Sequence, residues 1–123
     1  LFLRRKVIQR FDVEYFEKED GTFPAEEFIL SQDNKMRAKI FRLLELLEQK
    51  GNTLREPYSK SLDDGIFEIR AKQGNNITRV LYFFYIGNKI ILTNGFVKKS
   101  QKTPPSEIAL AKKYRAEYER RLV

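Results

Sequence analysis

The 123-residue sequence contains no cysteine and no histidine. These two absences exclude disulfide bonds, zinc sites built from cysteine and histidine, and catalytic triads with a histidine base. The longest unbroken apolar run, residues 80–86, is far shorter than the roughly 20 residues that a membrane-spanning helix needs. The first residues are basic and no secretory signal segment follows them, so we expect a cytoplasmic protein without a membrane anchor.

Aromatic side chains, in contrast, are plentiful. The sequence holds ten Phe and six Tyr, and hydrophobic residues make up 41% of it. This composition is typical of a chain that folds around a packed core. The length falls within the usual range of one compact domain, so we expect residues 1–123 to form a single domain.

The positive charge is unevenly distributed along the chain. The formal net charge is +7, and residues 98–123 carry eight basic side chains against three acidic ones. A concentrated basic surface attracts phosphate backbones, and the same surface attracts acidic proteins. A solvated basic helix without a partner is the simpler alternative.

The apolar pattern predicts a strand over residues 3–11, a helix that begins at Pro24, and a second, amphipathic helix that ends near Gly51. The second helix is the clearest element, because its apolar residues recur at helical spacing: Met36, Ile40, Leu43, Leu44 and Leu47. Residues 53–65 contain Pro57 and polar turn residues, and we expect a loop there.

Three predicted strands follow, over residues 66–72, 77–86 and 89–97. The connections between them are too short for a crossover helix, so the strands should form an antiparallel meander. A last helix opens at Ser106. The order predicts an α+β fold, in which two N-terminal helices and a C-terminal helix pack on one side or end of a small antiparallel sheet with a mixed edge.

Charged residues within these strands are unusual. If residues 87–88 form a two-residue turn, Arg79 lies opposite Phe96 and diagonally from Lys98, on one face of the sheet. A tight connection at residues 74–75 places Arg70 directly opposite Arg79, with Glu68 on that same face.

Two arginines across from each other should repel, so folding alone does not account for this arrangement. We expect that a bound phosphate accounts for it. We therefore expect Arg79 to lack a firm counterion and to be dispensable for folding. In the alternative interpretation, Glu68 pairs with one of the arginines on a solvated face.

Three stretches of the sequence carry recognisable motifs: residues 24–28, residues 58–83 with the strand Arg79-Val80-Leu81-Tyr82, and residues 95–111 with the run Lys98-Lys99-Ser100-Gln101-Lys102-Thr103-Pro104. The second stretch resembles the RelE/ParE toxin superfamily. The first and third resemble its phage-derived HigB-like branch. The resemblance covers nearly the whole chain.

This resemblance implies a RelE-like fold and the toxin of a type II toxin–antitoxin system. Such a toxin is an endoribonuclease that cleaves messenger RNA on the ribosome and inhibits translation. Its cognate antitoxin in this branch is a HigA-like helix-turn-helix protein. The partners implied are therefore the antitoxin, the ribosome and mRNA.

Carried over by position, Arg79 matches the catalytic arginine of the superfamily, and Arg70 matches the basic residue that ends the preceding strand. Lys98 and Lys99 match the basic residues after the last strand. Glu68 departs from the pattern, because RelE has a lysine near this position.

Cleavage requires charge stabilisation at phosphorus and proton transfer at the 2′ and 5′ oxygens. Arg70 and Arg79 are suited to the first task, because each presents a planar fork of donors to a phosphate. With no histidine, the base and the acid must come from Lys98, Lys99, Glu68 or a tyrosine. We expect no catalytic metal and no other cofactor. Further lysines are expected to bind RNA: Lys60, Lys72 and Lys102.

Two alternatives of other classes remain at this point. A ParE-like toxin would inhibit gyrase by binding and would not cleave RNA. A non-catalytic module would use its basic face merely to dock a nucleic acid or an acidic protein.

Overall fold

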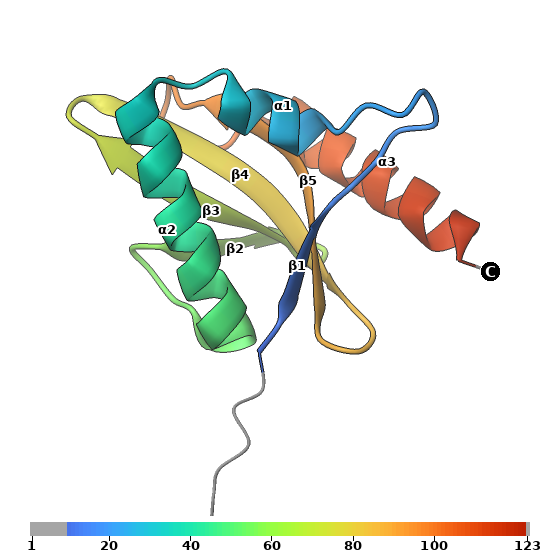
Figure 1. The fold of residues 1–123 in the computed structure, drawn as a ribbon. Helices are drawn as coiled ribbons and strands as arrows, with labels where there is room; N and C mark the ends of the chain where they lie inside the picture. Colours follow the sequence, from blue (N-terminus) through green and yellow to red (C-terminus); the bar gives the residue numbers. More distant parts are fainter. Residues whose placement is uncertain (1–9, 123) are drawn as a thin grey trace, which may run out of the picture.

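The computed structural model describes residues 10–122, which form a five-stranded sheet with three helices (Figure 1). The strand order is β1-β5-β4-β3-β2, with β1 parallel to β5 and the other neighbours antiparallel. The strands are β1 (Asp12–Tyr15), β2 (Ser59–Asp63), β3 (Ile66–Gln73), β4 (Asn76–Tyr85) and β5 (Lys89–Val97). The helices are α1 (Pro24–Leu30), α2 (Asn34–Lys50) and α3 (Pro105–Arg121), with a 3-10 turn η1 (Gly51–Thr53) after α2. The α+β prediction with a mixed sheet is confirmed.

Local chemistry accounts for the helix boundaries. Helix α1 begins at Pro24, whose missing N–H group costs nothing in a first turn. The Asp33 side chain caps α2 by accepting a hydrogen bond of 2.8 Å from the backbone N–H of Met36. At the other end, Gly51 has a φ of 52°, a conformation that glycine adopts without strain and that ends the helix as predicted. All five residues of the predicted apolar stripe are buried.

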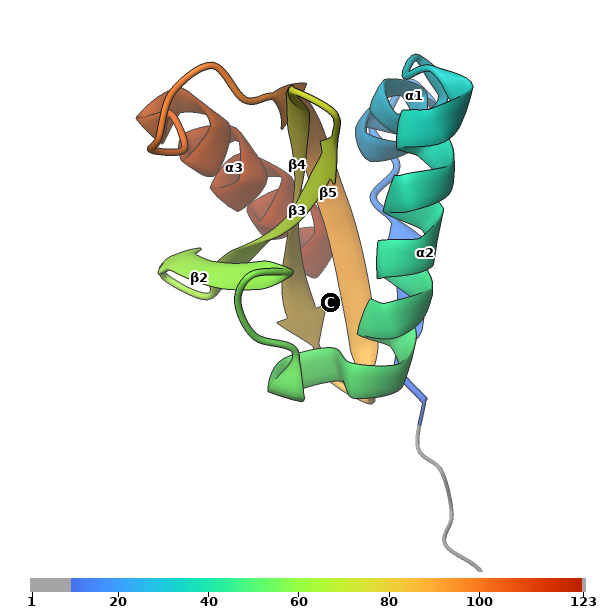
Figure 2. The same ribbon diagram turned by 90° about the vertical axis from the view of Figure 1, so that its left-hand side faces the viewer.

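The helices cover both faces of the sheet, which corrects the expectation that they lie on one side or end. Helices α1 and α2 pack on one face, and α3 packs on the opposite face (Figure 2). Alternate residues of β4 supply the two cores: Val80 and Tyr82 face α2, whereas Leu81 and Phe83 face the α3 side. Residues 80–83 are buried on both faces of the sheet, which accounts for the first part of the apolar run, whereas Ile86 at its end lies in the turn and is 81% exposed.

Two strands differ from prediction. Residues 59–63 form β2, although we expected residues 53–65 to be a loop. This edge strand is short and mostly polar, so no apolar alternation reveals it; it pairs with β3 across the turn at Asp64 and Gly65. The strand predicted over residues 3–11 lies mainly outside the described residues, and β1 begins at Asp12.

The β4–β5 connection also differs from prediction, because its turn is longer and a bulge offsets the change in register. Tyr85 pairs with Lys89, so the turn contains three residues instead of two. A β-bulge then restores the predicted register, because Thr93 and Asn94 both lie across from the single residue Leu81. Beyond the bulge, Arg79 lies opposite Phe96, as predicted.

Across the described part of the chain, residues 10–122, no helix combines the length and the apolar character needed to cross a membrane.

Candidate functional site

A buried ion pair lies on the α3 face of the central strands. Glu68 of β3 and Arg79 of β4 are 0% and 2% exposed, and Glu68 Oε2 lies 2.7 Å from Arg79 Nη1. The expectation that Arg79 lacks a firm counterion is therefore wrong. A buried arginine requires a partner, because the cost of removing its charge from water is otherwise several kcal/mol.

The same carboxylate also binds the second arginine. Arg70 lies directly opposite Arg79, as predicted, and its Nε donates a 2.9 Å hydrogen bond to Glu68 Oε2. The repulsion between the arginines is thus offset by a carboxylate of the chain itself, and no bound phosphate is needed to explain it. The alternative interpretation of Glu68 as a counterion is correct, although the carboxylate is buried and not solvated.

Thr103, which sequence reasoning missed, closes the network from the opposite side. Its hydroxyl donates a hydrogen bond to Glu68 Oε1 and accepts one of 2.7 Å from Arg79 Nη1. Arg79 Nη2 also donates to the Gln101 carbonyl at 3.3 Å. The loop between β5 and α3 therefore covers Arg79. Thr103 stands before two prolines, but a threonine in such a loop gives no signal of a buried role.

One polar group of this network remains unsatisfied. Arg79 Nε is buried and has no hydrogen-bond partner among the described residues. Glu68, in contrast, uses both oxygens, since Oε2 binds both arginines and Oε1 accepts from Thr103. With no exposed surface, Glu68 is placed to orient the arginines.

Lys98 lies at the open side of this network, where β5 ends. Its backbone N–H donates to the Ile77 carbonyl at 2.8 Å, which fixes the start of the loop against β4. Partial burial lowers the pKa of the Lys98 amine, and the positive charges of Arg79 and Arg70 lower this pKa further against the opposing effect of Glu68. This direction of the pKa shift favours proton transfer by the Lys98 amine.

The remaining predicted lysines are exposed, and the structure gathers most of them around the same face. Lys60 pairs with Glu68 across β2 and β3, and it lines a pocket of about 250 Å³ together with Lys102 and Arg79. Lys99 lines a neighbouring hollow beside Lys98. Lys72 lies opposite Ile77, farther along β3.

The described residues offer no evident metal site on this face. Within residues 10–122, no group of three or more acidic side chains is arranged to hold a metal ion. The Glu68 carboxylate is itself occupied by two arginines and Thr103.

Comparison with known families identifies the relatives of this fold and site. Residues 27–116, about three quarters of the chain, match the family described as Phage derived protein Gp49-like (DUF891). The chain belongs to this family. The Gp49-like family is a RelE-type toxin family, which implies an antitoxin partner. The matched range includes every residue of the site. Among curated proteins, none matches the chain significantly in sequence.

The buried ion pair of Glu68 and Arg79 leads to a prediction about the free energy of unfolding. Replacing Arg79 with alanine removes the main partner of a buried carboxylate, and we expect the free energy of unfolding to fall by about 3–5 kcal/mol. Urea denaturation measures this change. Lys102→Ala, which removes an exposed cation of the same face, should change the value by less than about 0.5 kcal/mol. The double variant Glu68→Leu/Arg79→Met should recover much of the loss, because it removes both charges together. An Arg79→Ala protein as stable as the wild type would contradict this account.

A second prediction concerns Lys98. Arg70→Gln removes a neighbouring positive charge that disfavours the ammonium form, so the pKa of Lys98 should rise and the amine should stay protonated to higher pH. NMR titration of isotopically labelled lysine side chains measures this pKa. The matched control Arg42→Gln, on the exposed side of α2, should leave it unchanged. A wild-type Lys98 pKa at or above the usual lysine range would show that the neighbouring cations do not act on this amine.

Proposed function

We propose that this chain is a ribosome-dependent mRNA endonuclease of the HigB-like branch, which inhibits translation. One observation carries the proposal: Arg70, which Glu68 orients, lies near Lys98, whose pKa is lowered, and both lie beside the buried ion pair of Glu68 and Arg79. Membership of a RelE-type toxin family supports the same conclusion.

Arg70 is the candidate for binding the scissile phosphate. Glu68 holds its Nε, which leaves the outer part of the guanidinium directed away from the buried carboxylate. Its other partner, Glu56, binds Nη1 at 3.2 Å, and the Glu56 side chain is 64% exposed. Exposed ion pairs contribute little free energy, so a phosphate can replace Glu56. The arginine would then stabilise the negative charge that grows on phosphorus in the transition state.

Lys98 is the candidate for proton transfer. In the reaction, the 2′-hydroxyl loses its proton and its oxygen attacks the adjacent phosphorus. The bond from phosphorus to the 5′-oxygen breaks, and this oxygen takes up a proton. The products are a 2′,3′-cyclic phosphate and a 5′-hydroxyl end. A lowered pKa makes the amine a better base and acid for this exchange than an ordinary lysine, and Lys98 lies next to both arginines of the network.

Glu68 and Arg79 have positioning roles in this mechanism. Both are buried beneath Thr103, and they fix the geometry of Arg70 and the loop that carries Lys98. Lys60, Lys72, Lys99 and Lys102 are exposed and would hold the phosphate backbone on either side of the scissile bond.

We propose a HigA-like helix-turn-helix protein as the antitoxin. The exposed lysines of the α3 face give it an electrostatic target, and acidic side chains placed over them would block RNA. Neutralisation in the cell would then require contact near Lys98 or restraint of the loop that follows it.

A translation extract tests the function directly. We expect the purified chain to cleave a message while ribosomes translate it, to leave the free message intact, and to produce 2′,3′-cyclic phosphate ends. Activity should survive EDTA treatment of the protein once ribosomal magnesium is restored. Arg70→Ala should slow cleavage roughly a hundredfold, as expected for a donor to a developing charge.

The alternative outcomes identify other functions. Inhibition of DNA supercoiling without cleavage would assign the chain to ParE-like gyrase poisons. Inactivity in both assays would leave a binding module that docks through its basic face.

A further inference from the structure

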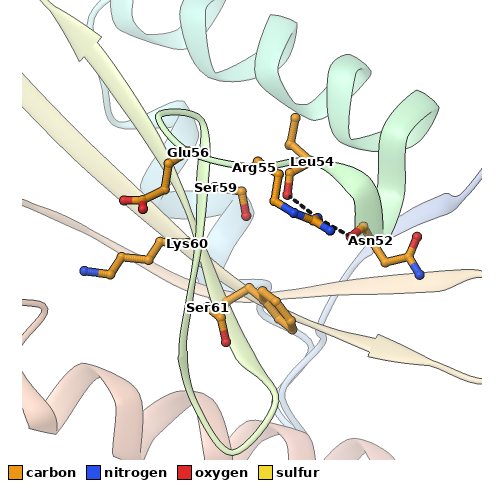
Figure 3. A pocket seen from close by; sticks show the side chains of 8 residues that line it. Asn52, Leu54, Arg55, Glu56, Ser59, Lys60 and Ser61 are labelled. Atoms are coloured by element: carbon orange, nitrogen blue, oxygen red, sulfur yellow. Dashed lines mark hydrogen bonds between the residues drawn. The ribbon is translucent and has the colours of Figure 1, made fainter.

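A separate hollow lies across β2 from the network of Glu68, Arg70 and Arg79. It has a volume of about 640 Å³ and lies between β2, Phe67 of β3 and the segment that follows α2 (Figure 3). Leu54 and Phe67 supply apolar walls, and Asn52, Arg55 and Ser61 supply polar groups. The mechanism proposed above uses none of these five residues.

The Phe67 ring has one face that neighbouring aromatic rings leave uncovered. Tyr82 stacks on Phe67 with ring centroids 5.5 Å apart and planes 19° apart. Phe84 is nearly perpendicular to both rings, at 5.2 Å from Phe67 and 5.7 Å from Tyr82. A ring so close to both members of a stacked pair must meet them at a shared edge, since a ring on the far face of Phe67 would be much farther from Tyr82. The face of Phe67 away from Tyr82 is therefore free of both rings.

Arg55 places a cation at this hollow in a defined orientation. Its Nη1 donates to the backbone carbonyls of Asn52 at 2.7 Å and Leu54 at 3.3 Å, while the residue remains exposed. An aromatic face beside an oriented cation is the combination that binds single-stranded nucleic acid, because a base stacks on the ring and a phosphate meets the charge.

The hollow and the charged network are connected across the edge strand. Lys60 lines both this hollow and the pocket over Arg79. Glu56 lines the hollow as well and forms an ion pair with Arg70 at 3.2 Å. In Figure 3, Lys60 and Glu56 point to one side of β2, and Asn52 and Arg55 lie to the other. An RNA chain with one phosphate at Arg70 can therefore pass Lys60 and reach the hollow.

We propose that this hollow is a nucleobase subsite, in which one unpaired base next to the cleaved position stacks on Phe67 while Arg55 and Lys60 hold the adjoining phosphates. The inference rests on the proposed function in that its ligand is RNA. It adds a second contact region, which would give the enzyme a preference for the base at one position relative to the cleavage point.

A series of uncleavable 2′-O-methyl oligoribonucleotides, each abasic at one position, tests this subsite by fluorescence anisotropy on the full chain. For the wild type, we expect one position at which loss of the base weakens binding about tenfold. In Phe67→Leu, which keeps an apolar side chain, removal of the same base should have little further effect. Such non-additivity identifies the ring and the base as partners.

Arg55→Ala gives an independent measurement that leaves the aromatic cluster intact. It should weaken binding of the unmodified oligonucleotide several-fold and reduce the salt dependence of binding by about one phosphate contact. The matched control Arg42→Ala removes the same charge from α2 and should leave both values unchanged.

The results separate this inference from the proposed function. If no abasic position changes the affinity of the wild type, or if Arg55→Ala binds like the wild type, the subsite is overturned even if the chain cleaves messages. The coupling with Phe67 in a chain that cleaves no message supports the subsite and overturns the nuclease. Loss of antitoxin affinity in Arg55→Ala, with unchanged RNA affinity, would assign the hollow to the protein partner and overturn the subsite.

Discussion

One buried carboxylate controls the arrangement of the α3 face. Glu68 neutralises two arginines on adjacent strands and accepts a hydrogen bond from Thr103 in the loop before α3. Without it, Arg70 and Arg79 would face each other with no carboxylate between them, and Thr103 of the loop would lose its acceptor on the sheet. A buried ion pair is weak evidence of stability as such, but it is costly to break, and it therefore fixes which segments meet.

The burial of Glu68 and Arg79 distinguishes the residues that position the site from those that can contact a ligand. Both terminal nitrogens of Arg79 are engaged, Nη1 with Glu68 and Thr103 and Nη2 with the Gln101 carbonyl, so Arg79 maintains the site from beneath. Arg70 and Lys98 occupy the accessible rim of the network and are the groups able to meet a phosphate. The superfamily resemblance points to Arg79 as the catalytic residue, whereas burial in this chain favours a positioning role for it.

Prediction from the sequence succeeded where a single pattern determines the structure. The apolar stripe of α2 and the short connections of the β3–β4–β5 meander are such cases, and both are confirmed. The polar strand β2 gives no alternation to detect, and its pairing depends on β3. The three-residue turn and the bulge at Thr93 and Asn94 are two departures that cancel, so the register at Arg79 was predicted correctly from an incorrect turn.

The candidate site was predictable in part for the same reason. Strand periodicity places Glu68, Arg70 and Arg79 on one face, and the structure confirms this arrangement. Burial of that face could not be deduced, because it depends on where α3 and the preceding loop pack. Thr103 reaches Glu68 across 35 residues of sequence, and no local signal marks such a contact.

The assignment of proton transfer to Lys98 is tested most directly by combining cleavage kinetics with unfolding for Lys98→Met. The matched control is Lys35→Met, which removes an exposed amine of α2 on the other face of the sheet. Methionine keeps much of the lysine stem and removes the amine. The account predicts for Lys98→Met a free energy of unfolding within about 0.5 kcal/mol of the wild type and a cleavage rate at least a hundredfold lower, with Lys35→Met close to the wild type in both. A folded Lys98→Met protein that cleaves ribosome-bound message at the wild-type rate would contradict it.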